Sequence, residues 1–316
     1  MRIIQINAND AGQRLDKFLL KLMPAMPKGM LYKLIRKKDI RLNGKRCQGA
    51  ELLAVGDEVR IFAKEEFFAR PKQAFPFQAA KGTPQIVYED AQIIIAYKPS
   101  GMFAHGGENG AVSLLDEIQK YLYDKGLYHP EEEQSFAPAL CNRIDRNTEG
   151  LVIAAVTAEA LRTMNAAIRD RLVQKRYLAV TAAPLPKRED TCTAWLSRDE
   201  RTRRVTVKAE QFPGSKRICT QYKVLAQNGS LQLAEIGLLT GRTHQIRAHL
   251  AYLGAPLLGD PKYGKQDARE ENQCLCARSL TFTGLGGTAL AALDGKTVKA
   301  PLPAFVSRYF PDFQES

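Results

Sequence analysis

The apolar residues of this chain change their spacing near residue 86, and this change limits the folds open to it. Between Gln13 and Met23 they recur at helical spacing, and a second, basic helix is expected after Lys28. From Ile86 onward the apolar runs are short and bounded by turn residues, which is the pattern of β-strands. The length of 316 residues allows about two domains. The sequence therefore predicts a small helical module followed by a larger, strand-rich domain.

Strands outnumber helices in the second part of the chain. We expect strands at 86–88, 93–97, 151–156, 177–181, 222–225, 231–236 and 280–282, and helices at 113–123, 158–170 and 243–253. The short gaps favour an α+β fold with a mixed, mostly antiparallel sheet over a doubly wound fold. Residues 63–85, with three prolines and no clear period, are expected to form a linker, although their four phenylalanines indicate partial packing. The expected organisation is an N-terminal module (1–62), a linker (63–85) and a large domain (86–316).

The chain is strongly basic, and the excess charge is concentrated near its start. The formal net charge is +12, and residues 1–62 alone hold 13 Lys and Arg against 6 Asp and Glu. Such a charge favours a polyanionic partner, although a basic region is as often a solubilising face. Eight basic residues lie on the second predicted helix and the Asn43-Gly44 turn that follows, an arrangement that suits phosphate contacts: Lys28, Lys33, Arg36, Lys37, Lys38, Arg41, Lys45 and Arg46.

The N-terminal module resembles the S4-type RNA-binding module, built as two helices followed by strands. The resemblance rests on Arg14-Leu15-Asp16 at the start of the first helix, the basic second helix, the stretch 41–45 and the turn at Gly56-Asp57. That family binds structured RNA through the basic helix and loop. The resemblance therefore implies that the eight basic residues bind RNA.

The sequence lacks the motifs of several common kinds of active site and metal site. There is no P-loop, no GxSxG, no HExxH and no CxxC, and six cysteines are too few for a disulfide scaffold. On a helix, His244 and His249 would lie about 140° apart, so they cannot share a metal ion. No apolar stretch reaches 18 residues and the start lacks a signal-peptide core. We therefore expect a cytoplasmic protein with reduced thiols, without a metal, a cofactor or a membrane partner.

Two polar stretches are candidates for the functional site. In 142–155 a polar loop runs into a buried strand, and Asp145 lies between two arginines; the plain alternative is that Asp145 and Thr148 only close a turn. In 239–250 a helix opened by Thr243 would place Arg247 at the edge of an apolar stripe, where it could meet a carboxylate from a neighbouring loop. The plain alternative there is an arginine that extends toward solvent, beside a structural histidine.

These stretches, taken together, resemble the RluA-type pseudouridine synthases. The matching motifs are the loop 142–151, Lys175-Arg176-Tyr177-Leu178-Ala179, the segment 241–264, and the stretch 97–101 with His105. They occur in the family's order and cover nearly the whole chain. Two positions of the loop depart from the family pattern, with Asn142 in place of the usual His and Glu149 in place of the usual Ser.

The resemblance implies an isomerase that converts specific uridines of RNA, mostly in large-subunit ribosomal RNA, to pseudouridine. Breaking and remaking a glycosidic bond suits a carboxylate, so Asp145 is the expected catalytic residue. By resemblance, Tyr177 stacks on the base, Arg247 orients Asp145, and Arg143 fills the space left by the flipped uridine. The expected substrate-binding residues also include Thr148, Arg242, His244, Gln245 and Ile246.

Two other functions remain open from the sequence. One is a noncatalytic RNA-binding or ribosome-assembly protein with the same fold, and the other is a glycosidase that releases free uracil. The intact Asp145, Tyr177 and Arg247 argue against the first, because a buried ion pair without function costs desolvation energy. No obligate protein partner is implied, and we expect a monomer.

Overall fold

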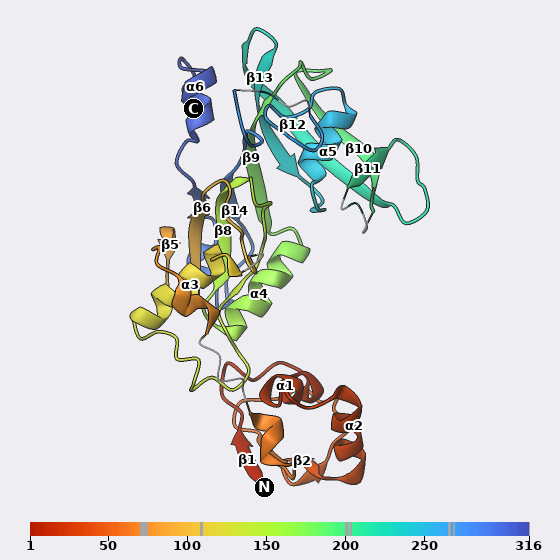
Figure 1. The fold of residues 1–316 in the computed structure, drawn as a ribbon, viewed down its shortest axis with the longest axis vertical. Helices are drawn as coiled ribbons and strands as arrows, with labels where there is room; N and C mark the ends of the chain where they lie inside the picture. The colour runs from red at the N-terminus through yellow and green to blue at the C-terminus, as the bar shows by residue number, and fades with distance from the viewer. Residues whose placement is uncertain are drawn as a thin grey trace.

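The computed structural model describes residues 1–69, 75–107, 110–199, 202, 204–264, 267 and 269–315. It has the expected α+β architecture, with a four-stranded sheet at the start of the chain and an eleven-stranded mixed sheet after it (Figure 1). In the described ranges we find no helix that is long and apolar enough to cross a membrane.

The N-terminal module contains both predicted helices and the predicted turn at Asn43-Gly44. Its elements are β1 (Arg2–Gln5), α1 (Leu15–Leu22), α2 (Lys28–Lys37), β2 (Ile40–Leu42), β3 (Lys45–Arg46) and β4 (Glu58–Ile61), and the sheet order is β1-β4-β2-β3. The apolar stripe of α1 explains its packing, because Leu15, Phe18 and Leu19 are fully buried. The basic side chains of α2 are left on the outside of this core.

The linker packs at both of its ends. It contains the short 3-10 helices η1 (Glu65–Phe68) and η2 (Pro76–Ala79). Phe68 joins the core of the N-terminal module, whereas Phe77 packs against Tyr123 and Tyr128 in the large domain. The middle of the predicted linker, residues 70–74, lies outside the described residues.

The large sheet is mostly antiparallel, with β14 and β8 as a parallel pair. Its order is β11-β10-β12-β13-β9-β14-β8-β6-β5, with β15 on β14 and β7 on β8. The strands are β5 (Gln85–Glu89), β6 (Ile93–Lys98), β7 (Ala139–Leu140), β8 (Glu149–Ala155), β9 (Val173–Thr181), β10 (Glu189–Arg198), β11 (Val205–Lys208), β12 (Lys216–Asn228), β13 (Leu231–Leu238), β14 (Leu275–Phe282) and β15 (Thr297–Lys299).

Strand β9 connects the two halves of this sheet (Figure 1). Because side chains alternate along a strand, Leu178 and Val180 enter one hydrophobic core and Tyr177 and Ala179 enter another. The sequence did not predict β1, β7, β10, β11 or β15. Most residues of β10 are exposed or half-buried, so it lacks the continuous apolar run that marks strands such as β6 and β8.

The helices of the large domain are α3 (Leu114–Asp124), α4 (Ala158–Arg169), α5 (Gln245–Tyr252) and α6 (Ala304–Tyr309), with a short 3-10 helix at η4 (Ala291–Leu293). The predicted cap of α5 at Thr243 is wrong. The helix begins one residue later, after His244, whose φ of 54° is left-handed and breaks the helical backbone. At its other end, Gly254 follows the helix at a φ of 86°, a left-handed backbone conformation that commonly ends helices.

Candidate active site

A loop between β7 and β8, which we call the catalytic loop (residues 141–148), carries Asp145. The Thr148 backbone N–H closes a turn by donating to the Asp145 carbonyl at 3.0 Å. The Thr148 hydroxyl is buried and accepts from Gln273 at 3.1 Å. Asn142 also anchors the loop, because its side-chain oxygen accepts from the Ile153 N–H at 2.8 Å. Both of these side chains therefore shape the loop, and the Asp145 carboxylate is free to face the neighbouring helix.

Lys98, the last residue of β6, anchors the catalytic loop through hydrogen bonds to backbone carbonyls. Its side chain is fully buried, and its ammonium group donates to the carbonyls of Pro99, Met102 and Arg146, each at 2.8 Å. Burial lowers the pKa of Lys98 to about 7, while the negative charges of Asp145 and Glu149 oppose this shift. Three carbonyl acceptors match the three donors of an ammonium group. This contact fixes the backbone immediately after Asp145.

Arg247, on α5, links two carboxylates from different parts of the chain. Its Nη1 donates to Asp145 Oδ2 at 3.0 Å, and its Nε and Nη2 donate to the two oxygens of Asp260, each at 2.8 Å. Asp260 is fully buried, and burial alone would raise its pKa; the Arg247 bonds outweigh this effect and lower it. Asp260 therefore holds two nitrogens of the Arg247 guanidinium, Nε and Nη2, and this directs Nη1 toward Asp145. Asp145 itself keeps 27% of its side chain exposed.

His244 lies beside this pair because of its left-handed backbone. The Tyr263 hydroxyl accepts from the Val205 N–H at 3.1 Å, so its own hydrogen is available for His244 Nδ1, which lies 2.8 Å away. His244 Nε2 lies 3.8 Å from Asp145 Oδ2. Burial lowers the pKa of His244, and the charge of Asp145 opposes the shift. A neutral ring with Nε2 as the donor fits these contacts.

Tyr177 enters the site from β9, at the centre of the sheet. Its side chain is almost fully buried, and burial raises its pKa. The negative charge of Asp145 adds to this rise. Tyr177 belongs to the hydrophobic cluster against which Ile144, the residue before Asp145, is packed. The phenol therefore stays protonated at neutral pH and presents a ring and a hydroxyl group to the site.

The other predicted site residues take different places. Arg143 is exposed and lies 3.1 Å from the His105 ring, and Arg242 is exposed too. Gln245 is buried and ties the loop before α5 to β12, since it accepts from the Arg242 N–H at 3.1 Å and donates to the Cys219 carbonyl at 3.1 Å. Ile246 is buried in the core behind the site. The structure thus brings Asp145, Tyr177, His244 and Arg247 together and places Gln245 and Ile246 behind them.

Sequence reasoning missed three residues that position this group: Lys98, Asp260 and Tyr263. All three lie within the motif stretches 97–101 and 241–264, so a signal was present in the sequence. Their roles depend on contacts between distant segments, such as Arg247 with Asp260 across 13 residues and Lys98 with Arg146 across 48. No local pattern assigns such partners.

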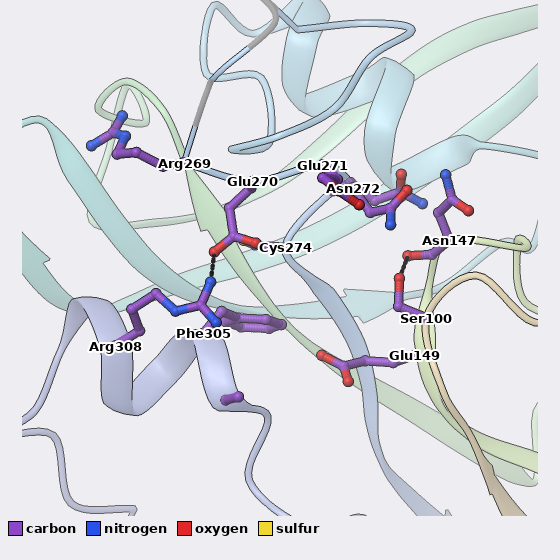
Figure 2. A pocket seen from close by; sticks show the side chains of 12 residues that line it. Ser100, Asn147, Glu149, Arg269, Glu270, Glu271, Asn272, Cys274, Phe305 and Arg308 are labelled. Atoms are coloured by element: carbon purple, nitrogen blue, oxygen red, sulfur yellow. Dashed lines mark hydrogen bonds and ion pairs between the residues drawn. The ribbon is translucent and has the colours of Figure 1, made fainter.

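Glu149, one of the two departures from the family pattern, borders a cavity of about 380 Å³ next to the catalytic loop. Figure 2 shows its carboxylate near that cavity, with the Ser100–Asn147 and Arg308–Glu270 contacts on the walls. The Tyr97 hydroxyl donates to Glu149, and burial raises the pKa of the Glu149 carboxyl. The larger residue is therefore accommodated by a tyrosine partner behind the loop.

The eight basic residues predicted to bind RNA form an exposed group on the N-terminal module. Four of them lie on α2, and Lys38 ends that helix with a left-handed φ of 67°. Arg41, Lys45 and Arg46 continue the group on β2 and β3. All eight side chains are exposed. This group, which we call the basic face, is open to a polyanion.

Comparisons with known proteins agree with this geometry. Residues 92–252 match the family described as RNA pseudouridylate synthase, and residues 13–59 match the S4 domain. The ribosomal large subunit pseudouridine synthase C of Salmonella typhimurium is 33% identical over 275 residues, which cover 84% of this chain and 81% of that protein. The proteins of the same name from Vibrio vulnificus and Escherichia coli K12 are 33% and 32% identical, each over 84% of this chain and over 80% and 81% of those proteins.

Solved structures share the fold. The human RNA Pseudouridylate Synthase Domain Containing 4 protein superposes with a TM-score of 0.57 at 22% identity, over 72% of this chain and 91% of that one. The sequence expectation of a synthase fold after an S4 module is therefore confirmed. The chain belongs to the RNA pseudouridylate synthase family and is an RNA pseudouridine synthase with an S4 domain ahead of its catalytic domain.

Proposed function

We propose that this enzyme isomerises specific uridines of large-subunit ribosomal RNA, with Asp145 as the catalytic residue and without a cofactor. The observation that carries the proposal is the Asp145 carboxylate, partly exposed and held at 3.0 Å by an arginine that Asp260 fixes from behind. The bacterial relatives named above are ribosomal large subunit synthases, which supports the same class of substrate.

The reaction keeps every atom of the uridine except one exchanged proton. The bond from N1 to C1′ breaks, the uracil turns, C5 bonds to C1′, and the proton on C5 leaves while N1 gains one. A carboxylate can serve as a nucleophile toward the sugar or the base, and it can relay the proton. Arg247 keeps the Asp145 carboxylate oriented for this role. Tyr177, with its phenol protonated, would stack on the uracil.

Two parts of the surface would handle the RNA. The exposed Arg143 would occupy the gap that a flipped uridine leaves in the RNA, which would offset part of the few kcal/mol that flipping costs. The basic face of the N-terminal module would contact phosphates at some distance from the reaction. Gln245, Ile246 and Thr148 would act by shaping the site rather than by touching the base. We infer a monomer that works in the cytoplasm.

The test is the Asp145→Asn variant, which keeps the shape of the side chain and removes its charge. Large-subunit ribosomal RNA labelled with tritium at C5 of uridine reports each turnover as released tritium. We expect a loss of release by at least about 1,000-fold, with RNA affinity within about twofold of wild type. Isomerisation by the variant at the wild-type rate would contradict the proposal. Free uracil as the product would instead indicate a glycosidase, and RNA binding without any product a noncatalytic protein.

A further inference from the structure

The N-terminal module is attached to the catalytic domain by more than the linker. Its loop 7–13 contacts two parts of the large domain, the segment 133–135 and the start of α4. Figure 1 shows the module beside the end of the catalytic domain that carries α4. We call the central contact set the domain lock: Asn9, Asp10 and Gln13 of the module with Ser135 and Arg162 of the catalytic domain.

Asn9 bridges two segments of the catalytic domain. Its side-chain oxygen accepts from the backbone N–H of Ala158 at 3.2 Å, and its amide nitrogen donates to Glu133 at 3.0 Å. Ala158 is the first residue of α4, where backbone N–H groups lack partners within the helix. Asn9 therefore helps to cap a helix of the other domain, so its contact depends on the relative placement of both domains.

Arg162 forms a second contact from the side of α4. It donates to the Ala11 carbonyl at 2.7 Å, and its guanidinium packs against Gly12. A side-chain carbon at Gly12 would lie only 2.9 Å from the Arg162 guanidinium carbon, and Gly12 also has a φ of 73°. The two domains approach here at a distance that a larger residue would not allow without a shift.

Asp10 is the buried centre of the lock. It is fully buried in the described structure, although it is a carboxylate. Ser135 donates to its Oδ1 at 2.6 Å, and Gln13 donates to the Ser135 hydroxyl at 2.8 Å. Burial of a carboxylate is costly unless it is hydrogen-bonded, so separation of the domains would remove the bond that Ser135 supplies. These contacts favour a single docked orientation.

A docked module and a tethered one would present RNA to the active site in different ways. With only one covalent connection, the module could take many orientations, and an RNA bound to the basic face could bring many uridines to Asp145. With the lock closed, the span from the basic face to Asp145 is fixed. A uridine then reaches the site only when the RNA structure places it at that span from the segment bound by the module.

We propose that the residues of the domain lock are specificity-determining residues, which select the uridine by fixing the position of the RNA-binding module relative to Asp145. The proposal rests on the proposed function above. It predicts that the substrate is a folded RNA, with the target uridine at a fixed distance from a second, phosphate-rich contact. None of the lock residues belongs to the catalytic group or to the basic face.

The test uses the full chain with the double substitution Asn9→Ala and Arg162→Ala. The matched control is Arg169→Ala, which removes an exposed arginine from the same helix. Small-angle scattering reports whether the module undocks. Total tritium release from C5-labelled large-subunit ribosomal RNA reports chemistry, and mapping of pseudouridines in the same RNA reports the choice of site.

We expect the double variant to have a larger radius of gyration and total tritium release within about threefold of wild type. The fraction of product at the wild-type position should fall at least fivefold, with new positions modified, and the control should match wild type. Ser135→Ala, a milder change, should shift the map in the same direction. An unchanged scattering profile would overturn the proposal, and so would an unchanged pseudouridine map after undocking. Loss of all tritium release would also overturn it, because the lock would then support the chemistry itself. Absence of pseudouridine with the wild type would instead refute the proposed function.

Discussion

At the scale of single residues, the site depends on how Arg247 divides its hydrogen bonds. Two of its nitrogens bind Asp260 and one binds Asp145. Asp260 also accepts from the backbone N–H groups of Lys262 and Tyr263, at 2.8 and 3.1 Å. It therefore joins α5 to the turn after it and makes Arg247 a fixed support. Asp260 acts through Arg247, as a positioning residue.

We predict that Asp260→Asn slows pseudouridine formation about 10- to 100-fold, because it weakens charged hydrogen bonds worth about 1.5 to 3 kcal/mol. Affinity for RNA should stay within about twofold. Single-turnover kinetics and filter binding measure the two quantities. Asp267→Asn is the matched control, since Asp267 bonds the partly exposed Arg269 outside the catalytic group. An unchanged rate for Asp260→Asn would mean that Asp145 alone orients Arg247.

At the scale of elements, the catalytic loop is held where β8 begins beside β14. Gly150 pairs with Ala277 in the parallel register, and its φ is 114°. A side-chain carbon there would lie 2.4 Å from the Ala277 carbonyl oxygen, which belongs to backbone and cannot rotate away. Glycine is thus required where the loop enters the sheet.

We predict that Gly150→Ala destabilises the protein by about 2 to 4 kcal/mol, through the clash and the unfavourable φ. Thermal unfolding should show a Tm lower by at least about 5 °C. Gly29→Ala is the matched control. Gly29 lies in α2 with no atom within 4 Å of the added carbon, so this change should not lower the Tm. Equal Tm values for the two variants would contradict the clash.

A second prediction at this scale concerns α1 and acid. Bonds from Arg14 and Tyr32 lower the pKa of the nearly buried Asp16 to about 2, from 3.8. The ionised form therefore stabilises the module above pH 3.8, and this stabilisation is lost as the pH falls through about 2. Hydrogen exchange of the peptide covering 15–22 should be faster in Asp16→Asn than in wild type at pH 6. The two should converge near pH 2.

The peptide covering α3 is the internal control, because its exchange should not respond to Asp16. If Asp16→Asn exchanged like wild type at pH 6, the Arg14 and Tyr32 contacts would add nothing to the stability of the module. A difference that persisted unchanged at pH 2 would show that it arises from shape rather than from charge.

At the scale of the whole molecule, charge and chemistry are divided between two bodies. The basic face is exposed on the N-terminal module, whereas Arg247 in the catalytic domain is buried and paired with carboxylates. Binding to phosphates releases counterions and depends on salt, but a buried ion pair is screened far less. RNA affinity and catalysis should therefore respond to different substitutions.

We predict that the combined variant Lys33→Gln, Arg36→Gln and Lys37→Gln weakens RNA binding and reduces the slope of log affinity against log salt by about 2. The rate at saturating RNA should change by less than about threefold. Lys120→Gln, Lys125→Gln and Arg169→Gln remove the same charge from helices α3 and α4 and their ends, and they form the control. If both variants lowered the slope equally, net charge rather than the basic face would drive binding.

The sequence by itself predicted most of the elements and the motifs of the proposed site. Helices α1 and α2 and strands such as β6 and β8 follow from the spacing of apolar residues, because that spacing is a local property of the chain. Strand β10 was missed because most of its residues face solvent or are half-buried. The Asp145 loop and the α5 segment were found because their motifs are contiguous in sequence.

Only the tertiary structure decided which groups meet. Arg247 reaches Asp145 across 102 residues, Lys98 reaches Arg146 across 48, and Asn9 reaches Ala158 across 149. His244 turns toward Asp145 because its backbone is left-handed, which places the start of α5 one residue later than its sequence suggests. Such partners are chosen by the packing of whole elements, and the energy of each contact depends on the burial that packing creates. The sequence therefore predicted the Asp145 carboxylate as the site's centre, and the fold supplied the residues that hold it and the contacts that dock the N-terminal module.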